Sequence, residues 1–287
     1  MSASMGGGPH RRSCAKNLRK KMRRSSERHV LTIFSGKVCA FQVYSNCMLS
    51  DTKEDEERYL TASEVGLYDS GDQQADTTAQ LKALAVMARQ RSLPVLLGPR
   101  VYLTNGETIF FSTSVKGAGR ALTLIKSTAT TEAGPVVAIS MSATIENLSI
   151  DGNVSPDPHV WTESNYDCFT GSEGLLIDAD EVAVRSVRVS NVRRAGFKVA
   201  FRRKKVTFED CEAEKCRGNF GDGFIAMAAR DVLYRNCRAR DFTRIGFVAD
   251  TYLDAAKAFC VAIRYEYCAA EDGHHGSILF GGTEYNA

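Results

Sequence analysis

Charged and imidazole side chains stand just before a series of glycines in the last third of the sequence. Asp222 and His275 each precede a glycine directly, and Arg244 lies two residues before another. A carboxylate or an imidazole can act as a general acid or base. A guanidinium fork binds carboxylates through paired hydrogen bonds. With one further carboxylate downstream, the candidate catalytic residues are Asp222, Asp250, Arg244 and His275.

The glycines recur because residues 182–280 are a repeat. Four stretches share one plan: an alternating apolar strand, a polar or aromatic residue beside valine or cysteine, a polar loop, and a glycine that opens another short strand. The step from Val206 to Val232 is 26 residues. Self-similarity at a period of roughly 20–50 residues indicates a solenoid. Because no helical pattern lies between the strands, the sequence predicts an all-β fold, a β-helix in which one core is shared by stacked turns.

Matching positions in successive turns of such a coil lie about 4.8 Å apart. The residues before the glycines should therefore stack along one face, together with outward positions on the strands. Arg194, Lys198 and His274 join the catalytic candidates there as residues that would bind substrate. We expect Asp222 and Asp250 to have Cα atoms within two turn spacings of each other.

The same stacking predicts two structural columns. Cys211, Cys237 and Cys268 should form an inward column of buried free thiols, although the spacing also permits a disulfide. Asn191, Asp210 and Asn236 should occupy sharp bends, where an Asx residue tolerates the left-handed backbone region. The nine cysteines include no CxxC pair, which argues against a zinc site.

The first 60 residues differ from the rest and are expected to be a basic leader followed by an acidic linker, with the domain spanning 61–287. Residues 10–28 contain nine Lys/Arg and one acid. The remaining 28 basic and 33 acidic side chains give the body a net charge of −5. Such a tail is weak evidence for nucleic-acid binding, so no nucleic-acid partner is expected. The apolar stretch that follows is too short and interrupted to span a membrane, and no clear signal peptide is present.

A single amphipathic helix is expected before the coil. Thr77 and Gln80 have the spacing of a capping box, apolar residues then recur with helical periodicity, and Pro94 ends the helix. A solenoid needs a polar outer face on its terminal unit. We therefore expect this helix to cap the N-terminal end of the coil. Its buried face is predicted to comprise Leu81, Leu84, Ala85 and Ala88.

The stretch from Val65 onward resembles the opening of the pectate-lyase superfamily. A glycine-aspartate turn, an Asp-Thr helix, VLLGPRVYL and VKGAG follow one another as they do in that family. The chain departs from it by GDQQADTT in place of a doubled aspartate, and by Gly98-Pro99-Arg100 in place of Pro-x-Gly. The resemblance covers about residues 65–280. It implies a single-stranded right-handed parallel β-helix, and an extracellular or virion-associated location.

The resemblance implies polysaccharide as the partner, but the superfamily includes lyases, glycoside hydrolases, phage tailspikes and inactive structural members. Elimination from a uronate would need a base and a cation, for which Arg244 and His275 are the candidates. Hydrolysis would need two carboxylates roughly 5–10 Å apart, for which Asp222 and Asp250 are the candidates. The loop at 154–174 could add two aromatic rings for stacking on sugars: Trp161 and Tyr166.

A rival class remains open, a non-catalytic structural or adhesion module such as a tailspike-like stem. The DGHHG sequence is similar to one polygalacturonase motif, but the other motifs of those enzymes are absent. No cofactor is expected. Calcium assists many members of the superfamily, yet no dense acidic cluster here demands it. The chain ends in FGGTEYNA with no evident cap. Two alternatives follow: the sequence is a fragment, or another subunit closes the end, which would make the protein a homo-oligomer.

Overall fold

The computed structural model describes residues 30–34, 37–41, 59–67, 74–129, 134–154, 173–218, 220–250, 260–274 and 278–282. The chain divides into two units, Met1–Lys53 and Glu54–Ala287. In the first unit, β1 (Val30–Phe34) and β2 (Lys37–Phe41) form an antiparallel pair. Within the described residues, no helix is long and apolar enough to cross a membrane.

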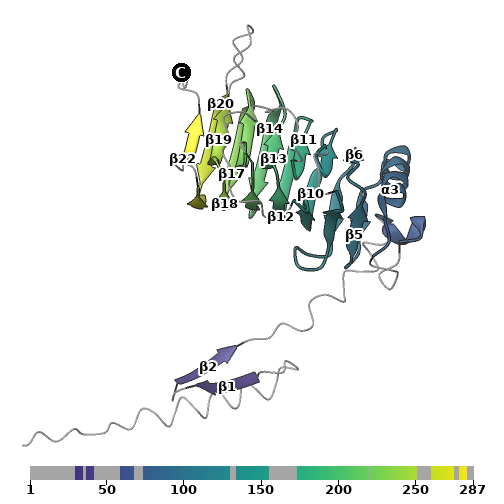
Figure 1. Cartoon of the computed structure of the whole chain (residues 1–287). Helices are drawn as coiled ribbons and strands as arrows, with labels where there is room; N and C mark the ends of the chain where they lie inside the picture. The colour runs from purple at the N-terminus through teal and green to yellow at the C-terminus, as the bar shows by residue number, and fades with distance from the viewer. Residues whose placement is uncertain are drawn as a thin grey trace, which may run out of the picture. The chain divides into compact units, whose positions relative to one another are not determined.

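The second unit is a parallel β-helix with three faces, as predicted (Figure 1). Face 1 consists of β3 (Leu60–Thr61), β4 (Val95–Leu97), β7 (Val115–Gly117), the first halves of β10 (Thr144–Asp151) and β12 (Val182–Val192), β14 (Lys204–Glu209), β17 (Arg230–Arg235) and β20 (Val261–Glu266). Face 2 consists of β5 (Val101–Thr104), β8 (Leu124–Ser127), the second halves of β10 and β12, β15 (Glu212–Cys216), β18 (Arg238–Phe242) and β21 (Ala269–Gly273). Face 3 consists of β6 (Ile109–Phe111), β9 (Val137–Ile139), β11 (Leu175–Ile177), β13 (Ala195–Val199), β16 (Asp222–Met227), β19 (Ile245–Asp250) and β22 (Ile278–Gly282).

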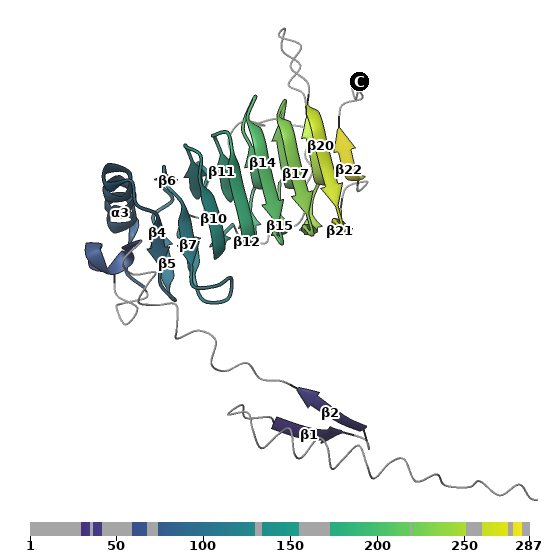
Figure 2. The same cartoon turned by 180° about the vertical axis from the view of Figure 1, so that it is seen from behind.

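All strand pairs between successive turns are parallel and in register, and seen from behind the strands of face 1 run side by side (Figure 2). Val182, Val206, Val232 and Ile263 are partners along one such row. Each chain segment therefore packs against segments one repeat away in the sequence. This is the stacking that the repeat predicted.

The bend between faces 1 and 2 is made by left-handed residues. Asp210 and Asn236 have φ of 53° and 51°, and Asn236 donates a side-chain hydrogen bond to the Asp210 carboxylate. Asn191 has the predicted left-handed backbone, with φ of 53°, but it does not lie in the column of Asp210 and Asn236. It is aligned with Lys215 within face 2. The residue of β12 at the first bend is Ser186, with φ of 50°. Left-handed residues thus form more than one column.

The predicted thiol column is confirmed. Cys211 and Cys237 are buried, Cys268 is half-buried, and all three are free. Each thiol donates to a carbonyl oxygen of the preceding turn, as Cys237 Sγ does to Phe208 O at 3.5 Å. The column therefore fills narrow core space and also satisfies backbone carbonyls beside the bend.

Two parallel stacks of aromatic rings fill the core. On face 3, Phe224 stacks between its neighbours in adjacent turns with ring centroids 4.7 Å apart on both sides. On face 1, Tyr234 stacks between its neighbours at 5.0 and 5.2 Å. The two stacks meet edge to face, and such ring pairs contribute about 0.5–1.5 kcal/mol each beyond their buried area. The rings are Phe197, Phe224 and Phe247 on face 3, and Phe208, Tyr234 and Tyr265 on face 1.

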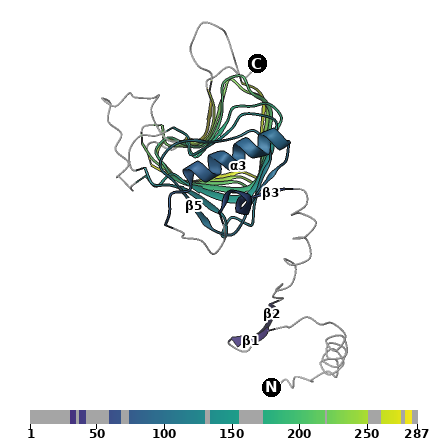
Figure 3. The same cartoon turned by 90° about the vertical axis from the view of Figure 1, so that its right-hand side faces the viewer.

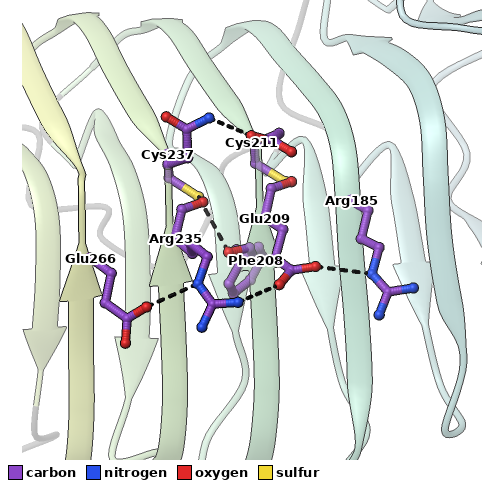
Figure 4. A network of polar contacts seen from close by, with 9 residues as sticks. Arg185, Phe208, Glu209, Cys211, Arg235, Cys237 and Glu266 are labelled. Carbon is purple, nitrogen blue, oxygen red and sulfur yellow. Dashed lines mark hydrogen bonds and ion pairs between the residues drawn. The ribbon is translucent and has the colours of Figure 1, made fainter.

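A ladder of ion pairs crosses the outside of face 1 (Figure 4). Glu209 lies between Arg185 at 3.1 Å and Arg235 at 3.0 Å, and Arg235 continues to Glu266 at 2.9 Å. Exposed pairs of this kind contribute little to stability one by one. Their alternating charges favour the observed register, because slipping a strand by one residue would turn its charged side chains toward the core.

The helix α3 (Thr78–Arg91) lies across the N-terminal end of the coil (Figure 3), after the short 3₁₀ helix η1 (Ala62–Val65). Its predicted apolar face is buried in full: Leu81, Leu84, Ala85 and Ala88. The predicted capping box is wrong. Asp76 Oδ1 accepts the Thr78 N–H at 2.9 Å, and the Thr77 hydroxyl instead donates to Leu103 O. The helix start is therefore tied to face 2.

Inward glycines open the strands of face 3 because no side chain fits there. A Cβ on Gly223 would lie 2.5 Å from both Ala239 Cβ and Gly246 O. A Cβ on Gly196 would lie 2.7 Å from Ala213 Cβ. The glycines thus let faces 2 and 3 meet closely at this edge of the coil.

We predict that Gly223→Ala lowers the free energy of unfolding by about 1–3 kcal/mol, because the added methyl group meets backbone and a packed Cβ atom. Gly134→Ala is the matched control. Its Cβ would meet only the Thr108 hydroxyl, which can rotate away. Urea denaturation of both variants measures the difference. Equal losses in the two variants would show that close approach is not what requires Gly223.

Candidate functional site

Four candidate residues lie on or beside face 3. Lys198 is on β13, Asp222 begins β16, Asp250 ends β19, and Arg244 immediately precedes β19. Arg194 occupies the turn that enters β13. His275, Trp161 and Tyr166 lie outside the described residues. The structure thus places five of the predicted residues on or beside face 3, at different points along its strands.

Asp222 and Arg244 form a buried clamp between two turns of the coil. Arg244 Nε donates to Asp222 Oδ1 at 2.8 Å, and its Nη2 donates to Oδ2. The Ile245 N–H adds a third hydrogen bond at 3.2 Å. Asp222 is only 1% exposed, and the Arg244 guanidinium lies 4.6 Å from the centroid of the Phe220 ring. The pair holds β16 and β19 together at the edge where faces 2 and 3 meet.

Burial governs the protonation of this clamp. Removing the Asp222 carboxyl from water disfavours its charged form and raises its pKa, although Arg244 and the Ile245 N–H oppose this change. The charge of Asp250 makes the smallest contribution in the raising direction. For Arg244, burial is the largest single cause and acts to lower the pKa, but the hydrogen bonds to Asp222 and the charges of Asp222 and Asp250 together outweigh it and the pKa is raised.

Glu173 is a second acidic centre, and the sequence reasoning missed it. It is 5% exposed and accepts from Lys198 Nζ at 2.7 Å, while Arg194 Nη1 lies 3.3 Å away. The signal was present, since Glu173 precedes Gly174 as Asp222 precedes Gly223. A Cβ on Gly174 would meet the neighbouring turn as closely as one on Gly223. Two predicted substrate-binding cations thus neutralise a buried carboxylate.

Asp222 and Asp250 are not the close pair that was expected. The register pairs Asp250 with Met227, which is five residues beyond Asp222 on β16. At about 3.3 Å per residue, their Cα atoms lie roughly 16 Å apart along the strand direction. The expected separation of two turn spacings is therefore wrong, because the two residues stand at opposite ends of adjacent strands. Asp250 is half-buried and forms no ion pair with a described residue.

His274 belongs to a neighbouring cluster at the end of face 2. Its Nε2 lies 2.9 Å from Asp241 Oδ1, and Arg217 Nη2 donates to Asp241 Oδ2 at 2.7 Å. Neither Arg217 nor Asp241 was predicted. Only the strand register reveals them, since Asp241 aligns with the left-handed residues Lys215 and Asn191 rather than with the residues before the glycines.

The outward side of face 3 is apolar between its charged ends. Ile225 is 7% exposed and Val248 is 4% exposed, and both pack with Ala195, Met227 and Ile245. In the part of the chain that the structure describes, no group of three or more His, Cys, Asp or Glu residues could hold a metal ion. Face 3 therefore combines paired charges with buried apolar side chains.

We predict that Asp222→Ala lowers the free energy of unfolding by roughly 2–4 kcal/mol, because it leaves the Arg244 guanidinium without its counter-charge. Asp250→Ala, the matched carboxylate on the adjacent strand, should cost less than about 0.5 kcal/mol. Urea denaturation at neutral pH compares them. Similar values for the two variants would contradict a clamp at Asp222.

The raised pKa of Asp222 predicts a specific pH dependence. A group whose pKa is higher in the folded state stabilises the fold fully below its unfolded pKa, and this contribution is lost as the pH rises through the folded pKa. The free energy of unfolding of the wild type relative to Asp222→Asn should therefore be largest in acid and shrink toward neutral pH. Denaturant titrations over a series of pH values test this. A difference that grows with pH would mean that the pKa is lowered.

No family model matches the sequence, and no curated protein matches it. Several solved structures are similar to it in fold. The catalytic domain of a GH87 alpha-1,3-glucanase in complex with tetrasaccharides has a TM-score of 0.58 at 16% identity, over 78% of this chain and 37% of that one. The Agl-KA catalytic domain has a TM-score of 0.57 at 12% identity, over 79% and 44%. The pre-mature gene product 12 of bacteriophage phi29 has a TM-score of 0.56 at 14% identity, over 82% and 36%.

These identities show the fold alone, a parallel β-helix. The resemblance inferred from the sequence is thereby confirmed at the level of fold. The chain spans less than half the length of each of these three structures.

Proposed function

We propose that this protein binds a polysaccharide along the outward side of face 3. One observation carries the proposal: buried ion pairs, apolar side chains and a half-buried carboxylate succeed one another on the strands of a single surface. Lys198 and Asp250 supply polar groups at different points along it. Ile225 and Val248 lie between them but are buried, so the polar groups are what a ligand could contact. A small number of placed polar groups fixes the orientation of a bound ligand.

Similar solved structures support a glycan as the ligand. Structures of a GH87 alpha-1,3-glucanase catalytic domain in complex with tetrasaccharides and with nigerose have the same fold at 16–17% identity. At this distance the likeness does not carry over any residue role. It makes a saccharide the first ligand class to test.

Binding is favoured over cleavage by the geometry of the described residues. For hydrolysis, the carboxylates of the candidate pair begin from Cα atoms roughly 16 Å apart along the strands, and Asp222 is occupied by Arg244. For elimination, Arg244 would have to leave Asp222 in order to meet a uronate carboxylate. Neither chemistry has its groups both positioned and available among these residues.

A non-catalytic stem is the second candidate, and a specific observation favours it. Ion pairs link successive turns on face 1 from Arg185 to Glu266 and on face 2 from Arg188 to Glu214. A rigid column with satisfied outer charges suits a structural role. The likeness to a bacteriophage protein is compatible with that role.

Binding to immobilised acidic and neutral polysaccharides separates these candidates. We predict that Asp250→Asn and Lys198→Ala each weaken binding by about tenfold, because a hydrogen bond to a charged group contributes about 1.5–3 kcal/mol. Arg185→Ala on face 1 is the control and should bind as the wild type does. Thermal melts check that every variant is folded. Loss of binding in the face 1 control alone, or no binding to any polysaccharide, would contradict the proposal.

The same samples are assayed for cleavage products. Ultraviolet absorbance detects unsaturated products of elimination, and reducing ends without that absorbance indicate hydrolysis. Bound polysaccharide without either product is the expected result.

A further inference from the structure

Two cations share the carboxylate of Glu173. Lys198 Nζ and Arg194 Nη1 lie 2.7 and 3.3 Å from the same oxygen, Glu173 Oε1. The carboxylate is buried, whereas the Lys198 and Arg194 side chains are 19% and 18% exposed. Two positive charges therefore meet one negative charge, and the two cations are the members that solvent reaches. These three residues are called the cation centre below.

The cation centre keeps its excess of positive charge because the neighbouring carboxylate is already paired. Asp222 lies one turn further along, where its backbone N–H donates to Arg194 O at 2.9 Å. Its carboxylate accepts both hydrogen bonds of the Arg244 fork, so that clamp is neutral in itself. Within the described residues, Arg194 and Lys198 form ion pairs with Glu173 alone. Charged groups taken out of water need a counter-charge, so an anion is the ligand group that completes the centre.

An exposed aromatic ring stands on the same outward column of face 3. Lys198 is the register partner of Leu176 in the preceding turn. Leu176 is aligned with Ala138, which is aligned with Phe110. Phe110 is 58% exposed, although the residues on either side of it in β6 are buried. Three steps of about 4.8 Å place the Cα atoms of Phe110 and Lys198 roughly 14 Å apart along the coil axis.

We propose that the cation centre and Phe110 recognise an acidic polysaccharide whose chain runs along the coil axis. This inference rests on the proposed function and narrows its ligand to glycans that carry carboxylate groups. The Arg194 fork and the Lys198 ammonium bind one carboxylate of the glycan. Phe110 packs against a sugar ring three turns away, because one side of such a ring carries C–H groups that fit an aromatic face.

The basic turn at residues 202–205 differs from the cation centre in burial. Its Arg203, Lys204 and Lys205 side chains are more exposed than those of Arg194 and Lys198, and each pairs with one acid of the preceding turn. Water already solvates these charges, so an anionic ligand stabilises them less. Arg203 is therefore a matched control for Arg194.

Carboxyl reduction of the ligand tests the charge preference on the full chain. Alginate, polygalacturonate and hyaluronan are tested, and the tightest binder is compared with its carboxyl-reduced form, in which each uronate has become a neutral sugar. We expect reduction to raise the dissociation constant by about tenfold. Arg194→Gln should raise it by about tenfold for the acidic form and leave it unchanged for the reduced form. Arg203→Gln should change neither value.

Replacement of the aromatic ring tests the second contact separately. Phe110→Ala should raise the dissociation constant by about fivefold for both forms of the polysaccharide, because the ring contacts sugar C–H groups and not the carboxylate. Phe201→Ala is the matched control, since Phe201 is also exposed but lies in the turn after β13, outside this column. Thermal melts confirm that every variant is folded.

The outcomes separate this inference from the proposed function. Binding to neutral polysaccharides alone, or equal affinity for the acidic and reduced forms, overturns the inference and leaves the proposed function standing. The inference also fails if Arg194→Gln weakens both forms equally or neither form, or if Phe110→Ala has no more effect than Phe201→Ala. A chain that binds no polysaccharide of either kind contradicts both.

Discussion

The in-register stacking of parallel strands is the constraint on which the rest of this structure depends. Each residue of the coil has its neighbours one repeat earlier and one repeat later, at about 4.8 Å. Each side chain therefore packs against the side chains at the same position in the turns before and after it. The thiols, the aromatic rings and the alternating charges of face 1 all form columns for this reason.

The same constraint decides what the candidate site can do. Asp222 meets Arg244 because the glycines bring successive turns together at the edge of face 3. Asp250 is kept away from Asp222 because the register places it at the other end of the adjacent strand. Buried charges are consequently neutralised in pairs, as their desolvation requires.

Much of the fold was predictable because repetition is visible in the sequence. The thiol column and the buried side of α3 follow from spacing alone. Two predictions were wrong for physical reasons that spacing does not contain. Asn191 occupies a left-handed position one bend further along, since β12 runs through two faces without a break. Thr77 turns its hydroxyl to Leu103 instead of its own helix, because the first turn of the coil lies beside it.

The site was less predictable than the fold, because it depends on partners that only the register reveals. Glu173, Arg217 and Asp241 are distant in sequence from the residues they contact. The sequence correctly placed Lys198 on an outward position, but its ion pair with Glu173 depends on the register between two turns of the coil.

A double-mutant cycle on Asp222 and Arg244 tests the central claim most directly. These residues are 22 positions apart in sequence and touch only if the turns stack in this register. The free energies of unfolding of Asp222→Ala, Arg244→Ala and the double variant should give a coupling energy of about 1–3 kcal/mol, as expected for residues in contact. A coupling energy of about zero would mean that the two residues do not meet, and would contradict the stacking described here.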